Sequence, residues 1–168
     1  EEGAAVKADP ENLETRKNIM WTATMALNGL IGTGVPQDWT THMIGHELTS
    51  LHAIDHARTL TIVLPSVMRE LKDSQKDKLL QYARNVWNIT DTDLDDDTII
   101  ETAIVHTENF FRELGLPVSL EDAELDKSAI DPIIKQLEAH KMVKLGEHGK
   151  NDLDVSRRIL ERAVTSKA

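Results

Sequence analysis

The sequence has 168 residues, a length that suggests one domain with room for a hydrophobic core. Its 29 acidic residues outnumber its 19 Lys and Arg residues, and the formal net charge of −10 argues against binding to nucleic acid or to a membrane surface. Cysteine does not occur, which excludes a disulfide framework, a thiolate zinc site and a catalytic cysteine. A chain without cysteine fits a reducing compartment, so we expect a cytoplasmic protein.

The sequence begins with Glu1 instead of Met, so we expect that it was processed or cut from a longer chain. Gly29, Gly32 and Gly34 come nearest to a phosphate-binding loop. They follow a helical pattern, however, whereas a dinucleotide or P-loop fingerprint needs a strand, a loop and then a helix. We therefore expect no cofactor-binding residues of this kind in the chain.

Apolar residues recur at helical spacing along the whole chain, and no convincing two-residue alternation indicates a strand. The sequence therefore predicts an all-α fold of about seven helices in one domain. The helical segments lie at about residues 10–31, 38–51, 60–71, 79–88, 98–114, 130–137 and 154–164.

Residues that begin or end helices support these segments. Asp9-Pro10, the acidic run from Asp91 to Asp97 and Asp154 are predicted N-caps, because aspartate accepts hydrogen bonds from the first free amides of a helix. Gly115 is typical of a helix C-terminus. Pro65, inside the third segment, predicts either a kink or a helix that begins near Ser66.

Histidine is concentrated in one short stretch of the chain. Four of the seven histidines lie within residues 42–56, as the pairs His42/His46 and His52/His56, each four residues apart on one helical face. Imidazole is the commonest metal ligand, and this spacing suits chelation. The alternative is that these are partly buried histidines that cap carbonyl groups or pack on apolar neighbours.

Helix geometry limits how these histidines can share an ion. In one straight helix, His42 and His56 would be about 21 Å apart. Either one pair alone forms the site, or the chain turns between His42 and His56, with Thr49-Ser50 and Asp55 as plausible breaks. Two histidines supply only two ligands, so tight binding of zinc or iron needs further ligands from elsewhere.

Other candidate motifs are weaker. His46-Glu47 begins like the zinc-protease motif HExxH, but Ser50 occupies the position of the second histidine. Asp38 and His42 have a spacing that could ligate a metal, although Asp38 is better interpreted as a helix cap.

The acidic run from Asp91 resembles the start of a calcium loop, but Asp96 and Thr102 replace the required Gly and Glu, so we interpret it as a helix start. Trp21, Trp39 and Trp87 are expected in the core or in a pocket wall.

Several stretches together resemble the C-terminal helical domain of the iron-containing (group III) alcohol dehydrogenases. The similarity is to the branch of NADPH-dependent aldehyde reductases and butanol dehydrogenases, and it extends over nearly the whole chain from about residue 11. The stretches that carry it are GLIGTGVPQDWTTHMIGHELTSLHAIDHA at 29–57, LQYARNVWNIT at 80–90, NFFRELGLP at 109–117 and LDVSRRI at 153–159.

The resemblance implies a two-domain enzyme with a divalent metal, iron or zinc, held by four ligands. These ligands are an Asp and a His four residues apart, followed by two histidines fourteen residues apart. His42 and His56 match the last two and are the expected metal ligands. His46 matches a histidine beside the nicotinamide and the substrate, so it is the expected catalytic residue, and His52 matches no functional position.

The resemblance also implies parts that these 168 residues lack. NADP or NAD would bind mainly to an N-terminal α/β domain, and the first two metal ligands precede the point where this sequence begins. We therefore expect residues 1–10 to be a lead-in, residues 11–168 to be a helical metal-binding domain, and the isolated chain to be inactive.

The expected full-length protein is an NAD(P)-dependent alcohol dehydrogenase or aldehyde reductase and a homodimer. It would act on a small aldehyde or alcohol, with the metal polarising the carbonyl or alkoxide oxygen during hydride transfer. Two alternatives stay open: a non-catalytic helical metal-binding or interaction module, and a structural domain whose histidines have no function.

Overall fold

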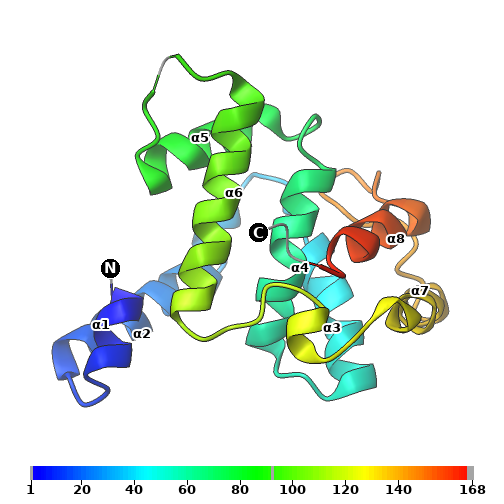
Figure 1. Ribbon diagram of the computed structural model, residues 1–168, viewed down its shortest axis with the longest axis horizontal. Helices are drawn as coiled ribbons and strands as arrows, with labels where there is room; N and C mark the ends of the chain where they lie inside the picture. Colours follow the sequence, from blue (N-terminus) through cyan, green and yellow to red (C-terminus); the bar gives the residue numbers. More distant parts are fainter. Residues whose placement is uncertain (1, 92, 166–168) are drawn as a thin grey trace. The chain divides into compact units, whose positions relative to one another are not determined.

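A computed structural model describes residues 2–91 and 93–165, and its elements are helices joined by loops (Figure 1). Within these residues there is no β-strand, only an isolated antiparallel bridge between Leu145 and Asn151. The predicted all-α class is therefore confirmed. The α-helices are α1 (Glu2–Ala8), α2 (Leu13–Leu27), α3 (Thr40–His52), α4 (His56–Glu70), α5 (Lys76–Trp87), α6 (Asp96–Glu113), α7 (Ile130–Ala139) and α8 (Leu153–Arg162), with 3-10 turns η1 (Leu30–Gly32), η2 (Glu121–Ala123) and η3 (Lys127–Ala129).

The described part of the chain thus has one α-helix more than the seven expected. The additional helix is α1, which lies inside the segment that we expected to be a lead-in. Contacts within the chain define two compact units, one that ends at Gln37 and one that begins at Asp38. The division into a lead-in of residues 1–10 and a domain of residues 11–168 stays a prediction.

The first unit consists of α1, α2 and η1, and here two predicted boundaries are wrong. Asp9 does not cap α2, because its Oδ1 accepts the N–H of Glu11 in a separate turn (3.2 Å). Asn12 is the cap, and its Oδ1 accepts the N–H of Thr15 at 3.1 Å. At the other end, α2 stops at Leu27 and does not continue to residue 31, because the next residues turn at Gly29 (φ 85°).

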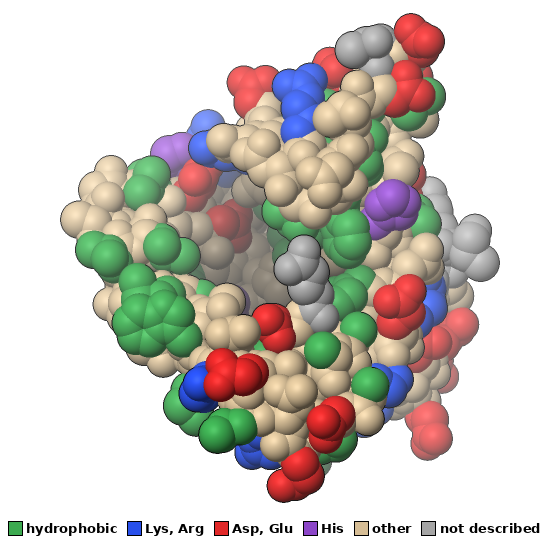
Figure 2. Space-filling view, turned by 90° about the vertical axis from the view of Figure 1, so that its left-hand side faces the viewer, with side chains coloured by type: hydrophobic (Ala, Val, Ile, Leu, Met, Phe, Trp, Pro, Cys, Tyr) green, Lys and Arg blue, Asp and Glu red, His purple; other side chains and the backbone are tan. Residues whose placement is uncertain are grey.

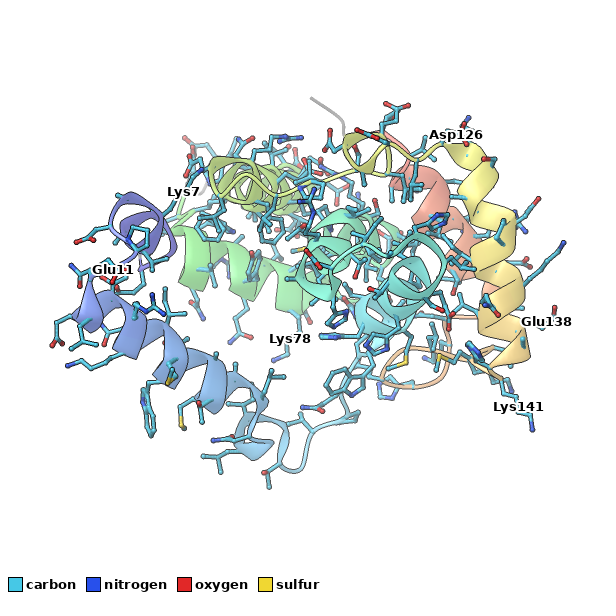
Figure 3. The ribbon with its side chains drawn as sticks, turned by 90° about the horizontal axis from the view of Figure 1, so that it is seen from below. Lys7, Glu11, Lys78, Asp126, Glu138 and Lys141 are labelled. Carbon is cyan, nitrogen blue, oxygen red and sulfur yellow. The ribbon has the colours of Figure 1, made fainter. Side chains whose placement is uncertain are left out.

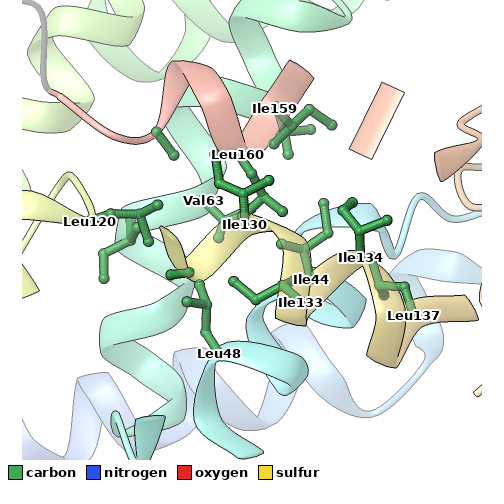
Figure 4. Close-up of a cluster of buried hydrophobic side chains, with 14 of the residues drawn as sticks. Ile44, Leu48, Val63, Leu120, Ile130, Ile133, Ile134, Leu137, Ile159 and Leu160 are labelled. Carbon is green, nitrogen blue, oxygen red and sulfur yellow. The ribbon is translucent and has the colours of Figure 1, made fainter. Parts of the chain in front are cut away.

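The second unit is organised around α4, which packs against α3, α6 and α8. Its larger hydrophobic cluster comes mainly from α3, α4, α7 and α8 (Figure 4). A smaller cluster joins α5 and α6 to Met68 of α4. Apolar residues buried on several sides of α4 identify it as the central helix, and this burial is the main stabilising contribution to the unit.

Helix α4 begins at His56 and runs through Pro65 without a break, so the prediction of a start near Ser66 is wrong. A proline inside a helix removes one backbone hydrogen bond and costs about 3 kcal/mol. Pro65 is itself buried, and Ile62 and Val63 beside it are fully buried. Packing therefore offsets the local cost of the proline.

Most of the other boundaries follow the predicted chemistry. Asp95 Oδ1 accepts the N–H of Thr98 (2.9 Å), so the acidic run begins α6 as predicted. Gly115 follows Leu114, the C-cap residue of this helix, and has φ 79°, as expected of a C-terminal glycine. Helix α8 is an exception, because Asp152 caps it through the N–H of Val155, whereas Asp154 lies in its first turn.

Two ion-paired groups fasten α4 to its neighbours. Arg69 donates to Glu108 (2.5 Å) and to Glu101 (2.7 Å), both on α6. Burial favours neutral guanidine, but the hydrogen bonds to these carboxylates outweigh it and raise the pKa of Arg69. On the other side of α4, burial raises the pKa of Glu70. Hydrogen bonds from Arg158 and Arg162 of α8 outweigh this effect, so the pKa of Glu70 is lowered.

Tryptophan only partly follows the expectation of burial. Trp21 is 66% exposed, so it is not a core residue in this structure. Trp87 is half-buried, and its Nε1 donates to Thr107. Trp39 lies beside a histidine, as described below.

Acidic side chains are scattered over the face shown in Figure 2. Glu138 and Lys141, near the end of α7, point away from the helices (Figure 3). Among the described residues, no helix combines the length and the apolar character needed to cross a bilayer.

Candidate metal centre

Three histidines meet where α3 is followed by α4. His42 and His46 lie one turn apart on α3, and His56 is the first residue of α4. The helices are separated by a short elbow in which Ala53 adopts the left-handed conformation (φ 55°) and Asp55 is extended. The chain therefore turns between His42 and His56, at Asp55, one of the two places that the sequence suggested. The turn lies inside the predicted pair His52/His56, so these two histidines belong to different helices and do not share a helical face.

The elbow brings His56 back to His42. The Nδ1 atom of His42 and the Nε2 atom of His56 are 3.2 Å apart, although the two residues are fourteen positions apart in the sequence. The ring of His46 lies 4.7 Å from that of His56, and one nitrogen from each of the three rings lies within 4.8 Å of the others. Trp39 packs edge-on against His42, with ring centroids 5.0 Å apart.

This geometry fits a shared divalent ion. Two nitrogens bound to one tetrahedral zinc at about 2.0–2.1 Å are about 3.3 Å apart. The separation of the His42 and His56 nitrogens matches that value. The other ring nitrogen of His56, Nδ1, is buried and lacks a partner among the described residues. A histidine that binds a metal through one ring nitrogen ordinarily donates the N–H of its other ring nitrogen to an acceptor.

The charge state of His42 also suits a ligand. Burial, followed by the nearby His56 and His46, lowers the pKa of His42 from its ordinary value of 6.5. Charging one ring of a clustered set repels charge on the others, so His42 is held neutral near pH 7. Metal ions bind the neutral ring, and this cluster therefore favours the form that coordinates.

Close packing of α3 on α4 depends on Gly45. A Cβ atom at this position would lie 2.8 Å from Oγ1 of Thr59. Thr59 is fully buried, and its hydroxyl donates to the carbonyl of His56. The absence of a side chain at Gly45 therefore allows α3 and α4, which carry the three histidines, to pack at their observed spacing.

We expect Gly45→Ala to disturb both stability and the site. The overpacking costs about 1–3 kcal/mol, and the better helix propensity of alanine returns about 1 kcal/mol. The free energy of unfolding, measured by urea denaturation, should fall, and zinc affinity should fall with it. Adding Thr59→Ala removes the clashing oxygen and should restore both quantities; a double variant as impaired as Gly45→Ala would contradict this account.

The start of α3 is fixed by two further contacts. The predicted N-cap Asp38 is wrong by one residue, because Trp39 occupies the N-cap position of α3 without a side-chain cap. Asp38 Oδ1 nevertheless accepts the N–H of Thr40 (2.7 Å), the first residue of the helix, and Asp38 is outside the three-histidine group. Asn151 donates to the buried hydroxyl of Thr40 at 2.8 Å. The loop closed by the Leu145–Asn151 bridge therefore anchors the helix that carries His42 and His46.

The remaining histidines lie apart from this group. His52 is half-buried, and its Nε2 has no partner among the described residues. His106 packs edge-on against Trp87, and His148 lies on an exposed loop.

A pair formed by Glu47 and His140, which was not predicted, lies beside the three-histidine group. Glu47, next to His46, is 3% exposed, and its Oε1 lies 2.8 Å from Nδ1 of His140. The two residues are 93 positions apart. No local pattern could have revealed this contact between α3 and the end of α7.

Comparisons with known proteins agree with one another. Residues 2–153 match the family model described as Fe-containing alcohol dehydrogenase family, C-terminal. The chain is 55% identical over 163 residues to the NADPH-dependent aldehyde reductase YqhD of Escherichia coli. The matched residues make up 97% of this chain and 42% of that protein. It is 34% identical over 127 residues to the NADH-dependent butanol dehydrogenase A of Clostridium acetobutylicum. Here the matched residues make up 75% of this chain and 32% of that protein.

Solved structures show the same relationship. The substrate- and cofactor-free form of E. coli YqhD superposes with a TM-score of 0.93 at 54% identity, over 96% of this chain and 42% of that one. The NADH-dependent butanol dehydrogenase A of Thermotoga maritima superposes with a TM-score of 0.88 at 27% identity, over the same shares. The chain therefore spans about two fifths of the length of these structures.

Proposed function

The chain belongs to the Fe-containing alcohol dehydrogenase family as its C-terminal part, and from this membership we propose that it is the metal-binding helical half of an NAD(P)-dependent alcohol dehydrogenase or aldehyde reductase. The observation that carries the proposal is the 3.2 Å approach of the His42 and His56 nitrogens. The names of the relatives supply the reaction class, reduction of an aldehyde or oxidation of an alcohol.

His42 and His56 are the proposed ligands of the metal, iron or zinc. When bound, such an ion supplies a Lewis acid that stabilises negative charge on the substrate oxygen. The elbow at Ala53 fixes the two rings relative to each other, so little reorganisation is needed for both to bind. The ring of Trp39 packs against the ring of His42 in a T-shaped arrangement.

His46 is the proposed proton-transfer residue. It is one helical turn from His42, and its ring is 6.2 Å from the ring of His42. Its side chain is exposed in this structure, so it is accessible to a substrate. At that position it would pass a proton to the oxygen of the product alcohol, a role that histidine suits near neutral pH.

The remaining parts of the proposal rest on the family. NADP or NAD would bind mainly to protein outside these 168 residues, and the hydride belongs to that cofactor. The substrate would be a small aldehyde or alcohol, and the assembly a homodimer. A non-catalytic metal-binding module is the alternative, and a Gly-rich α/β segment upstream in the parent gene would decide against it.

The test compares the isolated chain with a chimera in which it replaces the matched C-terminal part of E. coli YqhD. The shared fold makes this exchange conservative. We expect NADPH oxidation in the presence of an aldehyde from the zinc- or iron-loaded chimera and no turnover from the isolated chain. Turnover by the isolated chain, free of full-length enzyme, would contradict the account. A folded, metal-loaded chimera without activity would favour the non-catalytic alternative.

A further inference from the structure

A long uncharged stretch lies in the first unit. Residues 18–37 contain no Asp, Glu, Lys, Arg or His, although charged residues make up 29% of the whole chain. The stretch includes the second half of α2 and all of η1. The first turns of α2 do carry Glu14, Arg16 and Lys17, but its last ten residues carry no charge. A helical segment without charged residues is more typical of the interior of a protein than of its surface.

The apolar residues of this stretch are nevertheless exposed. Of all α2 residues, only Thr15 is buried. The exposed residues of the stretch, which we name the α2–η1 surface, are Met20 (73% exposed), Trp21 (66%), Leu27 (73%), Leu30 (64%) and Ile31 (68%). Soluble monomers rarely expose large apolar surfaces, so we expect these residues to contact another part of a protein.

The relatives indicate what this partner is. The family model describes a C-terminal portion, and this chain accounts for 41% of the solved E. coli structure that it matches with a TM-score of 0.94. In those relatives the larger share of the polypeptide therefore precedes the matched portion. Helix α2 and η1 lie near the N-terminal end of that portion, close in sequence to the preceding residues.

We propose that the α2–η1 surface docks the N-terminal part of the full-length polypeptide. The face that covers it must be apolar and free of unpaired charge, because the stretch offers no charged group to pair with one. Met20 and Leu27 are seven residues apart and share one side of α2, so they anchor the contact, with Leu30 and Ile31 extending it. This inference rests on the family assignment and is independent of the metal ligands.

The lack of cysteine allows a direct test by thiol labelling. Met20→Cys reports on the α2–η1 surface, and Glu138→Cys, an exposed position on α7, is the matched control. Labelling of each introduced thiol is followed by peptide mass spectrometry in the isolated chain and in the YqhD chimera. Met20→Cys should react at least about tenfold more slowly in the chimera, since a covered thiol reacts only when the contact opens. Glu138→Cys should react equally in both.

A second experiment needs no folded chimera. The N-terminal part of E. coli YqhD, expressed separately, is added to the isolated Met20→Cys chain, and the labelling rate should fall as its concentration rises. Equal rates in all samples would overturn the proposal. Protection in the isolated chain that grows with its own concentration would assign the surface to a second copy. Protection independent of concentration would assign it to α3–α8 of the same chain. Neither readout depends on turnover or metal, so failure here leaves the proposed function standing.

Discussion

Replacing His42 or His56 with alanine in the YqhD chimera should abolish metal retention. Each change removes one of two nitrogens that the elbow holds 3.2 Å apart. Loss of an outer partner of a ligand already costs about 10–100-fold in metal affinity, so loss of the ligand itself should cost at least as much. Metal content per chain after exhaustive dialysis, measured by mass spectrometry of the elements, reports the result.

Two further variants make this experiment specific. His148→Ala changes a histidine on an exposed loop and should retain the full metal content. His46→Ala should also retain the metal, whereas its kcat should fall by about 10²–10⁴-fold, the usual contribution of a proton-transfer residue. Full metal occupancy in His42→Ala or His56→Ala would refute the ligand assignment, and loss of metal in His46→Ala would reassign that histidine as a ligand.

Replacing Arg69 with methionine should strongly destabilise the helical unit. Glu108 is 1% exposed, and Oε2 of its carboxylate already lacks a partner among the described residues. Without Arg69, a buried negative charge would be left uncompensated, and breaking such a pair costs about 3–5 kcal/mol. Urea unfolding of the isolated chain, followed by circular dichroism at pH 7, measures the loss in the free energy of unfolding.

Two companion variants separate the buried charge from the lost side chain. Glu101→Gln alters the half-buried partner of Arg69 and should cost no more than about 1 kcal/mol. The double variant Arg69→Met/Glu108→Leu removes both buried charges and should recover most of the stability. If Arg69→Met is no less stable than Glu101→Gln, the ion pair does not fasten α4 to α6 as described.

The helices were predictable where the signal is local. Apolar spacing located the α2 to α8 segments, and Asp95 and Gly115 marked their boundaries correctly, because capping depends on residues within one turn. Local signals also compete, and this explains the errors. Asn12 and Asp152 displaced nearby aspartates as caps, and the burial of Pro65 in the central helix overrode its tendency to start a new one.

The candidate site was predictable only in part. Spacing singled out the histidines but left open whether the chain turns between His42 and His56. That turn uses Ala53 in a left-handed conformation, which no residue pattern announces, because alanine ordinarily favours the helix. Gly45 against Thr59 and Glu47 against His140 depend on tertiary packing and have no local signature.

Whether His42 and His56 bind one divalent ion together is tested most directly by nitrogen NMR of the YqhD chimera, because the isolated chain lacks the further ligands that tight binding needs. In long-range ¹H–¹⁵N spectra at pH 7.5, zinc titration should shift the His42 Nδ1 and His56 Nε2 signals together, with one ion per chain. The signals of His106 and His148 should stay unchanged. If the first two signals do not respond, or respond at different zinc concentrations, the two histidines do not share an ion and the proposed metal centre is wrong.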